Sequence, residues 1–134
     1  MTSSELPAEG PRDVSAPSDG GEAPFDDVIT LSTSHDGDGT VTVTVVGEVD
    51  TFTAPVLRSS LDTQLEQQPK ALVIDLSGVQ FLGSAGLAVL VETQKSARSR
   101  DVDLRLIATT RAVTRPLEVT GLIDLFTIVD GSPR

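Results

Sequence analysis

Hydrophobic residues follow a period of two in parts of the chain between residues 25 and 134. In residues 40–46 threonine alternates with valine, which is typical of a strand with one buried face. The other strand candidates are residues 25–32, 71–76, 102–108 and 125–129. The run at 71–76 (ALVIDL) is almost continuously apolar, which favours a strand covered on both faces. We therefore expect five strands.

A helical period separates the later strands. Leu57, Leu61 and Leu65 recur every four residues and predict one buried stripe on a helix over residues 54–67. Thr53 precedes this helix and is expected to cap it. A third helix is expected over residues 111–119, with Thr110 as its cap and Gly121 at its end.

The second predicted helix begins at Ser84 or Ala85 and runs to about residue 97. Its apolar and polar residues divide between two faces. The residues expected to face the sheet are Leu87, Leu90 and Val91, and those expected to face water are Glu92, Lys95 and Arg98.

The order of these elements predicts an α/β fold. Strands that alternate with helices imply parallel crossovers, so we expect a mixed, mostly parallel β-sheet of about five strands with helices packed on it. Residues 35–39 (HDGDG) join the first two strands as a turn. A calcium loop is the alternative, but the twelfth residue from Asp36 is Gly47, which has no side-chain oxygen.

Residues 1–24 differ in composition from the rest. They hold four of the chain's eight prolines and five acids against one arginine, which predicts a disordered, acidic, Pro/Gly-rich tail before a domain at 25–134. The first residues lack the layout of a signal peptide, and the apolar run 87–91 is too short to cross a membrane. We therefore expect a cytoplasmic protein.

Composition excludes several classes of function. The 134 residues carry a net charge of −10, from 20 acids and 10 bases, which argues against direct binding of nucleic acid or of anionic membranes. The absence of cysteine excludes disulfides and thiolate metal sites, and the single His35 excludes a multi-histidine metal site. We expect no cofactor, no metal and no enzymatic activity.

Two stretches contain candidate chemistry. Glu48 and Asp50 share a face if the chain is extended, as a carboxylate pair or as a solvated strand end. Residues 83–86 (GSAG) open a helix, where free amides suit an anion, although no known phosphate-binding spacing is matched. Ser84 is then a helix cap, a phosphorylated residue, or a nucleophile; the pattern of a nucleophile elbow is not matched.

Four stretches in order resemble the STAS domain family, and more narrowly the bacterial anti-sigma factor antagonists. They are residues 47–50 (GEVD), 53–57 (TAPVL), 72–87 (LVIDLSGVQFLGSAGL) and 119–122 (VTGL). The resemblance covers about residues 25–130. It implies a STAS fold and a partner-switching cycle of the bacterial stress-response type.

In that cycle the unphosphorylated antagonist binds an anti-sigma factor that is also a serine kinase of the GHKL type, which frees the sigma factor. The kinase then phosphorylates the antagonist with ATP, and a PP2C-type phosphatase resets it. Carried over by position, Ser84 is the phosphorylated residue and Asp50 is the family acid near it. The implied partner surface consists of Asp50, Thr51, Gly83, Ser84, Ala85, Gly86 and Leu87.

Two residues depart from the family pattern beside the acceptor serine. The family commonly has Asp where this chain has Gly83, and often Ser or Thr where it has Ala85. A member that binds constitutively and a member read by an atypical kinase are therefore alternatives. A STAS subunit of a transporter or signalling complex, with no sigma-factor role, is a further alternative.

Overall fold

The computed structural model describes residues 29–129, so the predicted tail at 1–24 lies outside the described residues. Five strands and three α-helices make up this part of the chain. The strands are β2 (Ile29–His35), β3 (Thr40–Val49), β4 (Ala71–Leu82), β5 (Asp103–Ile107) and β6 (Thr127–Val129). The helices are α1 (Ala54–Glu66), α2 (Ser84–Ser99), α3 (Arg111–Val119) and the short 3-10 helix η2 (Leu122–Leu125).

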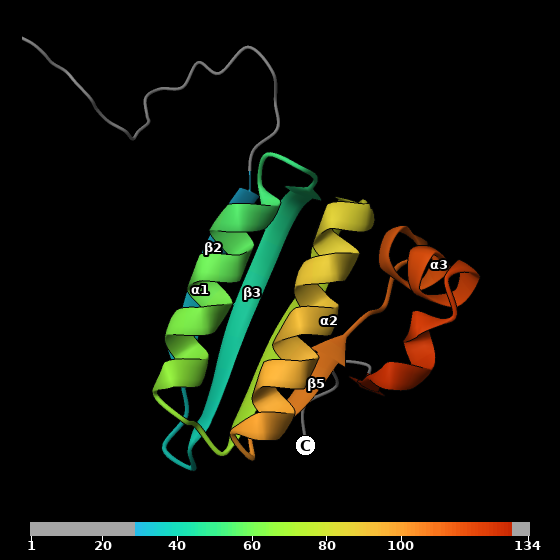
Figure 1. The fold of residues 1–134 in the computed structure, drawn as a ribbon. Coiled ribbons are helices and arrows are strands. Elements are labelled where there is room, and N and C mark those ends of the chain that lie inside the picture. The colour runs from blue at the N-terminus through green and yellow to red at the C-terminus, as the bar shows by residue number, and fades with distance from the viewer. Residues whose placement is uncertain (1–28, 130–134) are drawn as a thin grey trace, which may run out of the picture.

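The strands form one sheet in the order β2-β3-β4-β5-β6, in which β2 pairs antiparallel with β3 and the other pairs are parallel. This confirms the predicted mixed, mostly parallel α/β sheet. Parallel crossovers are right-handed, and here each new strand is added on the same side of the last. The helices α1 and α2 therefore lie together on one face of the sheet (Figure 1).

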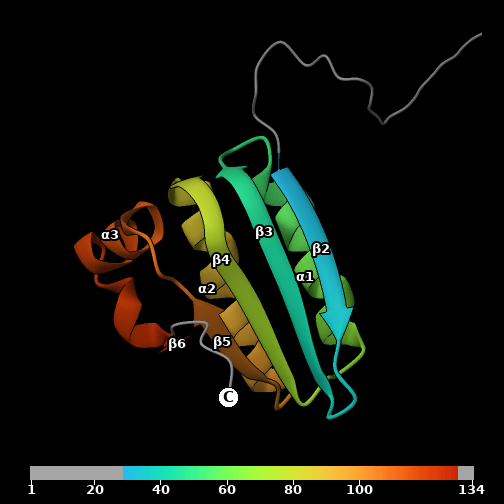
Figure 2. The same cartoon turned by 180° about the vertical axis from the view of Figure 1, so that it is seen from behind.

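The opposite face of β2, β3 and β4 is not covered by a described helix (Figure 2). Val73 and Asp75 point to this face and are half-buried, whereas Leu72 and Ile74 are fully buried beneath the helices. The prediction that residues 71–76 are covered on both faces is therefore wrong for the part of the chain that the structure describes. The apolar run misled because Val73 adds an apolar residue to the open face.

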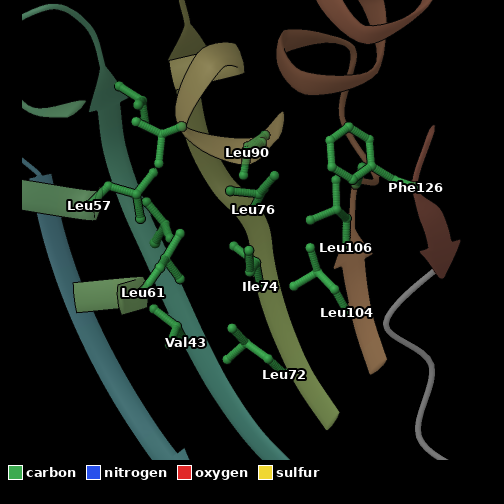
Figure 3. Close-up of a cluster of buried hydrophobic side chains, with 14 of the residues drawn as sticks. Val43, Leu57, Leu61, Leu72, Ile74, Leu76, Leu90, Leu104, Leu106 and Phe126 are labelled. Carbon is green, nitrogen blue, oxygen red and sulfur yellow. The ribbon is translucent and has the colours of Figure 1, made fainter. Parts of the chain in front are cut away.

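The core lies between the helices and the inner face of the sheet (Figure 3). Leu57 and Leu61 of α1 are completely buried and Leu65 is 1% exposed, which confirms the predicted stripe. On α2, Leu87 and Leu90 are buried and Val91 is half-buried, while the three predicted polar residues are exposed. The helices α1 and α2 thus each present an apolar stripe to the core.

The strand β4 runs six residues beyond its predicted end. The prediction stopped early because two irregularities break the alternation of buried and exposed residues. The pairing with β3 shifts register between Thr44 and Val46 and again between Gly47 and Glu48. At each shift β4 advances one residue more than β3, which is the definition of a bulge. The bulges turn Leu82 into the core, where it is 4% exposed, and leave Phe81 outside.

Candidate functional site

The candidate site lies where β3 and β4 end. Parallel strands end at the same edge of a sheet, so the loop from β3 to α1 and the turn from β4 to α2 are neighbours. The Gly83 N–H donates a hydrogen bond of 2.9 Å to the Val49 carbonyl and joins the two segments directly. We call residues 50–53 and 81–87 together the carboxyl-end surface.

The β3–α1 loop is held by its own side chains. The Thr53 hydroxyl donates to the Glu48 carbonyl (2.8 Å) and accepts the Asp50 N–H (2.9 Å). Asp50 Oδ1 in turn accepts the N–H groups of Phe52 (2.9 Å) and Thr53 (3.0 Å). The Asp50 carboxylate therefore shapes this loop by accepting backbone N–H groups, which differs from the predicted carboxylate pair with Glu48.

The predicted helix caps need correction. Thr53 and Thr110 do occupy N-cap positions, but neither side chain makes a capping hydrogen bond. Thr53 uses its hydroxyl inside the loop instead, and the buried Thr110 hydroxyl has no hydrogen-bond partner among residues 29–129. Ser84 is not a cap either, because Gly83 occupies the N-cap position and Ser84 is the first residue of α2.

Ser84 is exposed at the first turn of α2. The backbone of this turn packs tightly against the ends of β3 and β4. A Cβ atom at Gly86 would lie 2.6 Å from Leu82 Cδ1 and 2.6 Å from Val49 Cγ1. Only glycine lets the helix approach β3 and β4 this closely without a shift of its neighbours. The close approach fixes where the Ser84 hydroxyl stands.

The structure brings all seven predicted partner residues to this one edge, with different exposures. Thr51 and Ser84 are exposed, whereas Asp50, Gly83 and Ala85 are half-buried. Gly86 and Leu87 are buried. The two buried residues therefore support the turn, and the exposed and half-buried residues form its outer surface.

Sequence reasoning missed four exposed apolar residues, of which Phe52 and Phe81 belong to this surface. Phe52 is 78% exposed, Phe81 51%, Val56 51% and Val119 70%. The only signal in the sequence was the loss of alternation at the end of β4, which left Phe81 and Leu82 as consecutive large apolar residues. Phe52 and Phe81 both lie at the edge where β3 and β4 end, and exposed large apolar side chains that gather on one surface are typical of a contact site.

A groove of about 450 Å³ runs along α2 away from Ser84. Its apolar lining comes from Leu87, Ala88, Val91 and Leu122, and its polar lining from Ser84, Glu92, Lys95 and Thr120.

Among residues 29–129 no three His, Asp or Glu side chains gather so that they could hold a metal ion. No helix in this range is long and apolar enough to cross a membrane.

The comparisons with known proteins agree with this architecture. Residues 32–132 match the model of the STAS domain family. The chain is 35% identical to the anti-sigma-F factor antagonist RsfB of Mycobacterium tuberculosis over 100 residues, which are 75% of this chain and 80% of that protein. It is 35% identical to the anti-sigma-B factor antagonist of Listeria monocytogenes over 88 residues, 66% of this chain and 77% of that one.

A solved structure is similar over most of the chain. The crystal structure of an anti-sigma factor antagonist from Mycobacterium paratuberculosis superposes with a TM-score of 0.71 at 40% identity, covering 79% of this chain and 87% of that one. The family match begins within β2 and extends over the other four strands and all three α-helices. The chain therefore belongs to the STAS domain family, as the motifs at residues 47–57 and 72–87 had indicated.

Proposed function

We propose that this chain, an anti-sigma factor antagonist by homology, binds an anti-sigma factor through the carboxyl-end surface and is released when Ser84 is phosphorylated. The observation that carries the proposal is the exposed Ser84 hydroxyl on a turn fixed by Gly83 and Gly86. Asp50, Thr51 and Ala85 lie on the same edge of the sheet. Gly86 and Leu87 hold the turn in place.

In the proposed reaction the anti-sigma factor is also a serine kinase of the GHKL type. The Ser84 oxygen attacks the γ-phosphorus of ATP, a new P–O bond forms, and the bond to the ADP oxygen breaks while the serine proton passes to a base of the kinase. The antagonist is only a substrate in this step. A PP2C-type phosphatase then hydrolyses the phosphoserine with water and restores the binding form.

The charge of the phosphate explains why binding and folding respond differently. A phosphoserine adds about −1.5 to −2 charges. At the first turn of α2 the helix dipole favours that charge by about 0.3–1 kcal/mol, so the domain stays folded. Inside an interface the same dianion must lose its water, and a penalty of about 3 kcal/mol would weaken binding about a hundredfold.

Gly83 bears on which kinase could act. Glycine leaves no carboxylate beside the acceptor, so the kinase must recognise Ser84 through other groups of this edge. We therefore propose an atypical kinase contact over constitutive binding, because Ser84 remains exposed and so accessible to a kinase. We place this cycle in the cytoplasm, where sigma factors and ATP are available.

Two alternative functions carry less weight. Anti-sigma factor antagonists are non-enzymatic regulatory proteins, and the homology to them agrees with the expectation that the chain is not an enzyme. A role as a transporter subunit is disfavoured because the relatives at 35% identity are antagonists by name.

The test is mass spectrometry after incubation with ATP and each purified GHKL-type anti-sigma factor encoded by the same genome. The wild-type chain should gain one phosphate on Ser84. Ser84→Ala should gain none, whereas Ser59→Ala, which changes an exposed serine of α1, should be phosphorylated like the wild type. A phosphate on another residue, or none from any kinase that binds the chain, would overturn the switch.

A further inference from the structure

The carboxyl-end surface displays aromatic rings that nothing in the fold requires. The chain has four phenylalanines and no tyrosine or tryptophan. Phe126 is in the core with 9% exposure, whereas Phe52 is 78% exposed and Phe81 is 51% exposed. Two of the three phenylalanines in the described part of the chain thus lie outside the core and at the same edge as Ser84.

Phe81 is placed beside Ser84 by the second bulge of β4 and by Gly83. The bulge turns Leu82 inward, so that Phe81 points out. Its ring then lies against Gly83: a Cβ atom at residue 83 would be 3.0 Å from Phe81 Cε2 and 3.2 Å from Cζ. A Cβ at residue 83 would therefore press on the ring, which would have to shift by a few tenths of an ångström.

Phe52 is placed by the loop between β3 and α1. Its N–H donates to Asp50 Oδ1 at 2.9 Å, and the next residue, Thr53, is fixed by its bonds to Glu48 and Asp50. The backbone that carries the ring is thus fixed before any partner arrives, while the ring itself stays in water. A preorganised aromatic residue loses little entropy on binding, which is the property of a binding anchor.

We propose that Phe52 and Phe81 are the anchors with which this antagonist recognises its anti-sigma factor, and that Gly83 serves to hold the Phe81 ring beside Ser84. The partner is then an anti-sigma factor with an apolar pocket next to its kinase site. The inference rests on the proposed function, because the anchors are continuous with the surface around Ser84. Aromatic residues that enter well-packed pockets dominate the affinity of protein interfaces.

The arrangement also places the proposed phosphorylation site, Ser84, close to the proposed anchors, so that one partner would contact both. The main chain from Phe81 to Ser84 spans only three peptide steps, and Gly83 is hydrogen-bonded to Val49 at the start of the Phe52 loop. A phosphate on Ser84 would therefore bring charge and water to the border of the pocket that receives Phe81. Release by phosphorylation then follows from loss of an apolar contact as well as from charge.

The test is calorimetric titration of purified anti-sigma factors of the serine-kinase type from the same genome. Phe52→Ala and Phe81→Ala should each lower the affinity of the factor that binds the wild type by about thirtyfold or more. Val46→Ala is the matched control, because Val46 is 46% exposed and apolar but lies on the open face of the sheet; its affinity should change less than about twofold. Thermal unfolding should be nearly unchanged for all three variants.

Gly83→Ala tests the role of the glycine. The added Cβ should displace the Phe81 ring and lower the affinity, but it should have no further effect in a chain that already carries Phe81→Ala. Wild-type affinity for both phenylalanine variants, or an additive effect of Gly83→Ala, would overturn the inference and leave the proposed function standing. Failure of the wild type to bind any of these factors would overturn both.

Discussion

The two ends of the sheet are built by similar means and present opposite surfaces. At the amino end of the parallel strands the β2–β3 turn is closed by hydrogen bonds from Asp36 N to Thr40 O (2.8 Å) and from Thr40 N to Asp38 Oδ1 (3.0 Å). At the carboxyl end Asp50 and Thr53 close the β3–α1 loop in a comparable way. An aspartate that accepts backbone N–H groups therefore orders both loops.

The difference lies in what the ordered loops display. The β2–β3 turn exposes Asp36, Gly37 and Asp38, which satisfy a turn and remain in water. The carboxyl end exposes Phe52 and Phe81, which water does not favour. Local hydrogen bonding thus explains the stability of both ends, whereas only the apolar display of one end calls for a partner.

The largest expected effect on stability comes from the glycine at the carboxyl end, Gly86. Gly86→Ala should destabilise the domain by about 1–3 kcal/mol, because the added Cβ would overlap the stiff Val49 side chain and Leu82. Gly37→Ala is the control at the other end, because nothing lies within 4 Å of its Cβ position. Urea unfolding of both variants measures the difference, and equal stabilities would contradict the close packing beneath Ser84.

A smaller effect is expected from the loop threonine. Thr53→Val keeps the shape of the side chain but removes the hydroxyl that joins Glu48 and Asp50, which should cost about 1–2 kcal/mol. Thr51→Val, at an exposed neighbour, should change little. Chemical denaturation followed by circular dichroism gives both values. If the two variants are equally stable, the Thr53 network does not hold the loop.

The smallest expected effect is on unfolding by acid, and it concerns the β2–β3 turn at the opposite end of the sheet. The Thr40 N–H and hydroxyl hold the pKa of the exposed Asp38 carboxyl below its usual range. The folded turn thus favours the ionised carboxylate, so its contribution is present at neutral pH and is lost as the pH falls through the lowered pKa. Asp38→Asn should flatten this part of the acid-unfolding profile without affecting affinity for the anti-sigma factor. An unchanged profile would contradict this reading of the turn.

The sequence predicted those features that depend on local periodicity. The Leu57, Leu61 and Leu65 stripe follows from helical geometry, and α3 was predicted with its observed bounds, residues 111–119. The start of β4 at Ala71 was predicted, but its end was missed because its two bulges interrupt the period of two. A bulge depends on the partner strand, which the pattern of one strand does not reveal.

Within the site, the sequence located Ser84 and the residues predicted around it, but not the two exposed phenylalanines of the same surface. The resemblance placed Ser84, Asp50 and Gly83 together, and the hydrogen bond from Gly83 to Val49 supplies the physical reason. The exposure of Phe52 and Phe81 could not be predicted from the residue type, because the same residue type is buried at Phe126. Only the tertiary arrangement decides which phenylalanine faces the core.

The most direct test of the central claim is the affinity of Ser84→Ala and Ser84→Glu for the anti-sigma factor that the wild type binds, measured by calorimetry. Ser84→Ala should bind like the unphosphorylated chain and resist release by ATP, and Ser84→Glu should bind about a hundredfold more weakly if the charge costs about 3 kcal/mol. Both variants should unfold at nearly the wild-type temperature. Equal affinities of the two variants for this factor would contradict a switch at Ser84.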